Sequence, residues 1–183
     1  ILVLDSEVYS NTGGQLSKAT PLGATARFAV KGKQTRKKPL GLMAMQYENA
    51  YVAQVALGAN MQQLVRALME AEAHDGPSIV IAYTPCIAHG VSMSRSVEEE
   101  KRAVECGYWH LYRYNPALRG EGKNPFILDS RQPVKPLREF LLGENRFASL
   151  LREQPDTAEK LFAKAEEDSQ QLYERYSRLA MQS

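Results

Sequence analysis

The pattern of apolar and polar positions in the first half of the chain predicts three strands. Residues 1–4 are all aliphatic and lead into a polar loop, which is typical of a parallel strand buried on both faces. Residues 51–55 are mostly apolar, and residues 78–83 form a β-branched, apolar run. The third strand is expected to end before Pro85, because proline lacks the amide that a strand ladder needs.

Helical spacing appears between these strands and again at the end of the chain. Apolar residues recur at the period of a helix between positions 61 and 69. Residues 97–106 are rich in charge and predict an exposed helix, whereas residues 109–114 and 126–128 predict short strands. From Gln154 onward, an apolar stripe along a charged background predicts a long amphipathic helix.

Strands that alternate with helices predict an α/β fold with a mainly parallel sheet and flanking helices. We expect residues 1–130 to form this α/β domain and residues 131–183 to form a C-terminal helical extension. Ligands of such sheets bind outside the carboxyl ends of the strands. The loops after Asp5, Leu57 and Tyr83 are therefore the places to seek a site.

Composition and charge exclude several classes of protein. The 183 residues carry 23 Lys and Arg against 21 Asp and Glu, so a net charge of +2 does not favour nucleic acid as a partner. No apolar run approaches the roughly 20 residues that span a bilayer, and two cysteines suit a reducing compartment. We therefore expect a cytoplasmic protein with no membrane or nucleic-acid partner. The basic residues 31–38 predict a solvated surface turn or, alternatively, a docking surface for an acidic partner.

The loop after the first predicted strand concentrates oxygen-bearing side chains. Most residues between Asp5 and Gln15 carry a hydroxyl, carboxylate or amide group, and Gly13 and Gly14 allow the main chain to turn at positive φ. Such oxygens are the ligands that Mg²⁺ prefers when it also bridges phosphates. A diphosphate site is one interpretation, and an ordinary polar loop whose side chains satisfy turns is the other.

A cysteine follows the third predicted strand. Cys86 could be a nucleophile with His89 as its base, a ligand of an iron–sulfur cluster, or a small residue that packs at a strand end. Spacing alone does not choose among these, because the chain contains no C-x-x-C pair. We assign Cys106 to packing, and His74 and His110 to structural roles.

Both loops resemble the thiamine-diphosphate region of pyruvate:ferredoxin (flavodoxin) oxidoreductases. The resemblance is carried by residues 4–15, LDSEVYSNTGGQ, and by residues 17–21. It continues through residues 55–60, 76–78, 83–87, 107–109, 112–116 and 124–130. It implies the C-terminal portion of a far longer enzyme, with residues 1–130 forming a thiamine-diphosphate-binding domain that is truncated at its N-terminus. The absence of a starting Met would then be explained.

The resemblance also implies roles for individual residues. The Ser6 hydroxyl, where the family usually has Thr, and the Val8 carbonyl would coordinate Mg²⁺, and Cys86 would be the remote ligand of a [4Fe–4S] cluster. Asn11 would have a catalytic role beside the reacting part of thiamine diphosphate. The residues implied to bind this cofactor are Ser6, Glu7, Val8, Tyr9, Ser10 and Asn11.

The activity implied by the resemblance is oxidative decarboxylation of pyruvate to acetyl-CoA and CO₂. Electrons would pass through [4Fe–4S] clusters to ferredoxin or flavodoxin, and coenzyme A would take the acetyl group. The other partners would be the remaining domains of a homodimeric enzyme, without which the chain should be inactive. Two alternatives are a related oxidoreductase for another 2-oxo acid and a non-catalytic α/β interaction module that keeps these loops for packing.

Overall fold

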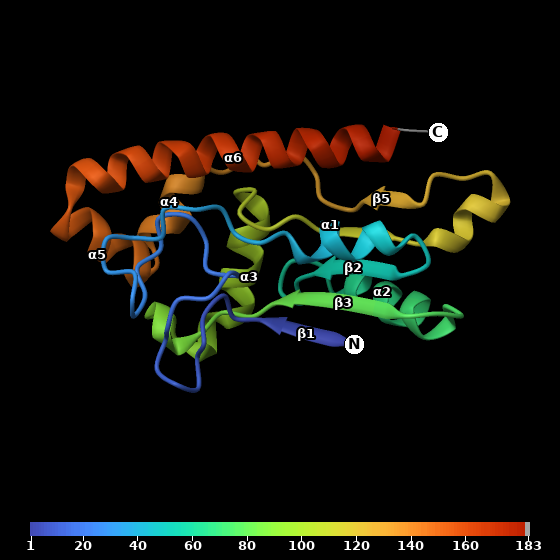
Figure 1. Cartoon of the computed structure of the whole chain (residues 1–183), viewed down its shortest axis with the longest axis horizontal. Helices are drawn as coiled ribbons and strands as arrows, with labels where there is room; N and C mark the ends of the chain where they lie inside the picture. Colours follow the sequence, from blue (N-terminus) through green and yellow to red (C-terminus); the bar gives the residue numbers. More distant parts are fainter. Residues whose placement is uncertain (182–183) are drawn as a thin grey trace.

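The computed structural model describes residues 1–181. Its strands form a five-stranded sheet of order β1-β3-β2-β4-β5 (Figure 1). The strands are β1 (Leu2–Asp5), β2 (Tyr51–Val55), β3 (Ser78–Tyr83), β4 (Tyr112–Tyr114) and β5 (Phe126–Leu128). β1, β3 and β2 run parallel, whereas β4 runs antiparallel to both β2 and β5. The prediction of a mainly parallel α/β sheet is therefore confirmed.

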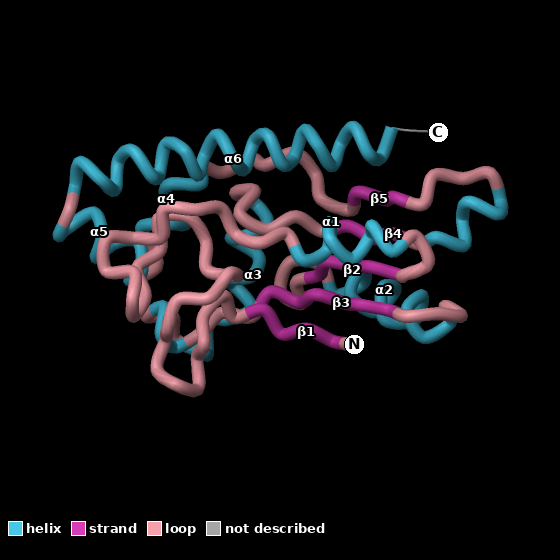
Figure 2. Tube along the Cα trace, in the orientation of Figure 1, coloured by secondary structure: helices cyan, strands magenta, loops and turns pink. Residues whose placement is uncertain are grey.

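Helices flank the sheet, and the longest of them crosses the molecule. The α-helices are α1 (Leu40–Ala44), α2 (Met61–Ala73), α3 (Ser96–Glu105), α4 (Leu137–Leu142), α5 (Asn145–Glu153) and α6 (Pro155–Met181). Short 3₁₀ helices span Met45–Tyr47, Ile87–His89, Met93–Arg95 and Pro116–Glu121. In Figure 2 the segment between β1 and α1 is almost entirely loop. None of the helices in the described part of the chain is long and apolar enough to cross a membrane.

Successive side chains of β2 enter two different buried layers, because neighbours along a strand point to opposite faces. Tyr51, Ala53 and Val55 pack with Ala67 of α2. Val52 packs on the other face with residues of α1, β4, β5 and α6. Burial on both faces explains why this strand is apolar almost throughout.

The prediction that the first strand is buried on both faces is wrong. β1 lies at the edge of the sheet, where Leu2 is 57% exposed and Leu4 is 65% exposed. Their register partners on β3 are Val80 and Ala82, which pack in the layer that contains α2. A run of apolar residues indicates a strand but does not say whether that strand lies at the centre or the edge of its sheet.

Two other segments differ in part from the sequence-based prediction. The helix expected to be exposed, α3, buries Glu99 and Glu100, because Glu99 accepts from Arg102 at 2.7 Å and Glu100 accepts from the Gly58 amide at 2.7 Å. The predicted strand 109–114 is regular only at Tyr112–Tyr114. Hydrogen bonds to these partners offset the free-energy cost of burying the two carboxylates.

The main hydrophobic core joins both predicted parts of the chain. Tyr83 and Trp109 belong to the same buried cluster as Phe140 and Phe162. The stripe predicted for the last helix is confirmed, since α6 buries Ala158, Leu161, Phe162 and Tyr176. The helical extension therefore packs on the α/β part, while the division into domains at residue 130 stays a prediction.

The burial of His110 predicts that stability depends on pH. His110 is 1% exposed and packs against Tyr173 and Tyr176 of α6, and neither ring nitrogen has a hydrogen-bond partner among residues 1–181. Burial lowers its pKa from 6.5 to about 4. At pH 5, His110 therefore takes up a proton when the protein unfolds. The stability that neutral His110 contributes is fully present above pH 6.5 and is lost as the pH falls toward 4.

We expect a change from pH 7 to pH 5 to lower the free energy of unfolding by about 2 kcal/mol through His110. His110→Phe keeps an aromatic ring against α6 and removes the titration. This variant should lose about 2 kcal/mol less than the parent chain over the same pH interval. Urea unfolding of both proteins at the two pH values measures the difference, and equal losses would contradict the assignment.

Candidate functional site

The loop that follows β1 turns tightly at Ser6, Glu7 and Val8. The Ser6 hydroxyl donates a hydrogen bond to the Val8 carbonyl oxygen at 3.2 Å. Adjacent oxygen ligands of an octahedral Mg²⁺, each about 2.1 Å from the metal, lie about 3.0 Å apart. At 3.2 Å, the two oxygens for which the resemblance implies magnesium ligation lie close to that spacing.

Glu7 links these two residues in a conformation that side chains rarely adopt. Its φ of 62° lies in the left-handed region, which costs a residue with a Cβ atom about 1–2 kcal/mol. Its amide donates to the Asp5 carboxylate at 3.1 Å, and its carbonyl accepts from the Thr20 hydroxyl at 2.6 Å. The main chain of Glu7 is therefore held on both sides.

The Glu7 side chain points into a buried group of charges. Its carboxylate accepts from the Lys37 ammonium at 2.7 Å, the Tyr108 hydroxyl at 2.5 Å and the Arg146 guanidinium at 2.8 Å. Burial raises the pKa of this carboxyl, but Lys37 and Arg146 outweigh burial and hold the pKa at about 2. Every polar atom of Glu7 thus has a partner within the chain.

The rest of the loop is open. Tyr9 and Asn11 are exposed, whereas Ser10 is half-buried. Gly13 and Gly14 have φ values of 106° and 83°, so both adopt the conformation that glycine favours, as the sequence predicts. Asn11 therefore lies on an accessible part of the turn that these glycines close.

Cys86 lies against this loop. Its sulfur is 3.0 Å from the Ser10 hydroxyl, and its side chain also accepts from the Ala88 amide at 3.4 Å. His89 is buried, neither of its ring nitrogens has a hydrogen-bond partner within residues 1–181, and burial lowers its pKa to about 3. His89 is thus not placed as a base hydrogen-bonded to Cys86, and the two loops that the sequence singled out separately are in contact.

Cys106 has a different environment. It belongs to the main hydrophobic core, as the assignment to packing expects, and burial raises the pKa of its thiol to about 12. Across residues 1–181, no three His, Cys, Asp or Glu side chains gather as a group that could hold a metal ion.

Comparison with known proteins identifies relatives that are much longer than this chain. No family model matches it. The chain is 61% identical over 180 residues to the "Pyruvate:ferredoxin oxidoreductase" of Moorella thermoacetica and 58% identical over 182 residues to the "Pyruvate-flavodoxin oxidoreductase" of Klebsiella pneumoniae. Both alignments cover 98% of this chain. The chain is homologous to a segment of these oxidoreductases.

A similar segment occurs in a protein whose name gives a different electron acceptor. The chain is 48% identical over 181 residues to "Pyruvate dehydrogenase [NADP(+)], mitochondrial" of Euglena gracilis. It spans 15%, 16% and 10% of the lengths of the Moorella, Klebsiella and Euglena proteins, respectively. The resemblance to pyruvate oxidoreductases is thereby confirmed, and the chain matches a small part of each.

The sequence pattern did not identify the residues that hold Glu7. Lys37 comes from the basic residues 31–38, whose prediction as a solvated surface turn is wrong in part. Lys33 is buried there and donates to the Thr20 carbonyl at 2.5 Å, and Arg36 pairs with Asp168 of α6 at 2.8 Å. The density of positive charge was a signal for Lys37, but no local pattern indicates Arg146.

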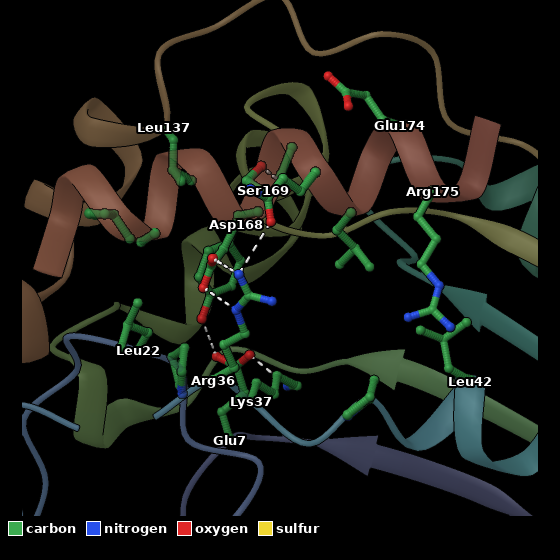
Figure 3. Close-up of a pocket in the computed structure, with 18 of the residues that line it drawn as sticks. Glu7, Leu22, Arg36, Lys37, Leu42, Leu137, Asp168, Ser169, Glu174 and Arg175 are labelled. Atoms are coloured by element: carbon green, nitrogen blue, oxygen red, sulfur yellow. Dashed lines mark hydrogen bonds and ion pairs between the residues drawn. The ribbon is translucent and has the colours of Figure 1, made fainter. Parts of the chain in front are cut away.

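A cavity of about 530 Å³ is lined in part by Glu7 and Lys37. Figure 3 shows Glu7 and Lys37 on one side of it and α6 on the other, with Arg36 reaching across to Asp168. Leucines from several elements line the space between them, including Leu22 and Leu42. The ion pair of Arg36 thus connects the basic segment to the last helix.

Proposed function

We propose that the chain supplies a pyruvate oxidoreductase with part of a site for thiamine diphosphate and Mg²⁺ and with one thiolate ligand of a [4Fe–4S] cluster. The observation that carries this proposal is the contact of 3.0 Å between the Ser10 hydroxyl and the Cys86 sulfur. This contact supports the proposal, because the implied cluster ligand would then lie against the implied cofactor loop. The names of these relatives, all of which include pyruvate, support pyruvate as the substrate.

The residues of the loop would have distinct tasks. The Ser6 hydroxyl and the Val8 carbonyl fit Mg²⁺ because their oxygens are 3.2 Å apart. The exposed amide of Asn11 would orient the aminopyrimidine of the cofactor or polarise the carbonyl of pyruvate. Bound thiamine diphosphate supplies the electron sink that allows a 2-oxo acid to lose CO₂.

Cys86 fits a cluster ligand in burial and position. It is 6% exposed, and a thiolate shielded from water is the kind of ligand that iron–sulfur clusters use. The other cluster ligands would come from elsewhere in the enzyme. Electrons released at the loop would thus have a short path to a cluster, in the direction of ferredoxin or flavodoxin.

The electron acceptor would be determined outside this chain. A segment 48% identical to it occurs in a protein named for NADP(+), while other relatives are named for ferredoxin or flavodoxin. Residues of this chain would therefore serve the steps that these enzymes share. The remaining domains of a homodimeric enzyme would supply the acceptor site and the contacts to coenzyme A, and the chain alone would be inactive.

Ser6→Ala in the full-length enzyme tests the magnesium site. Removing one ligand oxygen is expected to weaken Mg²⁺ binding at saturating thiamine diphosphate by at least about tenfold. Ser6→Thr keeps the hydroxyl and should bind as the parent does. Titration calorimetry on enzyme freed of both cofactors gives the affinities.

Ser92→Ala is the matched control, because the only hydrogen bond of the exposed Ser92 hydroxyl within residues 1–181 is to the nearby Ser94 hydroxyl, at 2.9 Å. Its affinity for Mg²⁺ should stay at the parental value. Equal affinities for Ser6→Ala and Ser92→Ala would contradict the proposed function and favour a non-catalytic module that keeps the loop for packing.

A further inference from the structure

We propose that Lys37 and Arg146 position the magnesium-binding turn by holding the carboxylate of Glu7. This inference rests on the proposed function of Ser6 and Val8. It adds two positioning residues that lie outside the loop and that no motif of the sequence indicates.

The first argument is the strained main chain of Glu7. A left-handed conformation at a residue with a Cβ atom persists only where its surroundings over-determine it. Here the φ of 62° belongs to the residue between the two implied ligands. Any relaxation of Glu7 would change the angle between the Ser6 hydroxyl and the Val8 carbonyl, so the contacts that hold Glu7 also hold the site.

Lys37 ties the turn to the sheet. Its ammonium is 2.7 Å from a carboxylate oxygen of Asp5 and 2.7 Å from Oε1 of Glu7. Asp5 is the last residue of β1, and its backbone is fixed by parallel pairing with β3. Lys37 therefore connects the start of the turn, which the sheet holds, to its strained centre.

Arg146 holds the other oxygen of the same carboxylate. Its guanidinium lies 2.8 Å from Oε2 of Glu7, which also accepts from Tyr108, and is itself held by Glu144 at 2.6 Å. Cations on both oxygens fix the rotation of the carboxylate as well as its position. Because the side chains of Glu7 and Arg146 are 1% and 2% exposed, water does not replace these contacts.

Loss of one cation should therefore move the turn. A buried carboxylate that keeps only part of its partners is strongly unfavourable. The turn can relieve this by relaxing its left-handed residue so that the carboxylate reaches water. Ser6 and Val8 would then no longer present their oxygens at the spacing that Mg²⁺ requires.

The test compares Lys37→Met with Arg36→Met in the full-length enzyme freed of thiamine diphosphate and Mg²⁺. Met keeps most of the apolar stem, and Arg36 is a neighbour from the same segment whose partners, Asp168 and Gln171, lie on α6. Lys37→Met should weaken Mg²⁺ binding at saturating thiamine diphosphate by at least about tenfold, as measured by calorimetry. Arg36→Met should keep the parental affinity, and Lys37→Arg should restore most of it.

Ser6→Ala, measured in parallel, separates the two proposals. A tenfold loss in Ser6→Ala with parental affinity in Lys37→Met overturns the positioning role and leaves the proposed function intact. Parental affinity in Ser6→Ala means that the proposed function itself has failed. If Lys37→Met does not give folded enzyme, Glu7→Gln keeps the shape of the side chain and is titrated in the same way, and parental affinity there also overturns the positioning role.

Discussion

Replacing Cys86 with serine in the full-length enzyme is expected to reduce pyruvate oxidation at least about a hundredfold and to remove one [4Fe–4S] signal from the electron paramagnetic resonance spectrum. Soft thiolate ligands suit iron–sulfur clusters, and a serine oxygen in the same place is a poor substitute. The replacement is otherwise small. Serine can keep the short contact to the Ser10 hydroxyl, which is now 3.0 Å from the sulfur.

Cys106→Ser is the matched control for this prediction. Cys106 is also buried, but its thiol donates to the Ala103 carbonyl at 3.4 Å within the main core, and serine can make the same bond. This variant should keep every cluster signal and lose stability at most. Equal effects of the two substitutions on activity and on the spectrum would count against Cys86 as a cluster ligand.

The sequence predicted the parts of the fold that depend on local patterns. The runs at 51–55, 78–83 and 126–128 are strands, and the stripe beyond Gln154 is a helix. These predictions succeeded because periodicity and chain breaks act over a few residues. The position of β1 at the edge of the sheet depends on strand order, which the local pattern does not contain.

Of the candidate site, too, the sequence predicted some features and missed others. Motif residues predicted which loop bears the candidate magnesium ligands and which bears the cysteine, and the structure brings Ser10 and Cys86 together. The inward turn of Glu7 was not predictable from the sequence. It depends on Arg146 of α5, which is far from Glu7 in the sequence and meets it only through the tertiary fold. Sequence spacing gives no measure of such a contact.

Gly58→Ala, in the loop that follows β2, is expected to disturb the fold strongly. A Cβ atom at residue 58 would lie 1.9 Å from the Val97 carbonyl oxygen and 2.6 Å from its carbon, and both are backbone atoms of α3. No side-chain rotation can relieve that overlap, so the loop after β2 must move away from α3. The move would also break the hydrogen bond of 2.7 Å from the Gly58 amide to Glu100.

We expect Gly58→Ala to lower the free energy of unfolding by about 3 kcal/mol or more, because it combines overpacking with a buried carboxylate that loses its donor. Gly120→Ala is the control, since a Cβ atom there would have no neighbour within 4 Å. That variant should change stability by less than about 1 kcal/mol. Urea unfolding curves give the stabilities of the two variants. Similar midpoints would mean that the loop after β2 is not in close backbone contact with α3. A large loss confined to Gly58→Ala would instead show that close backbone packing against α3 fixes the loop after β2, which no pattern of side chains reveals.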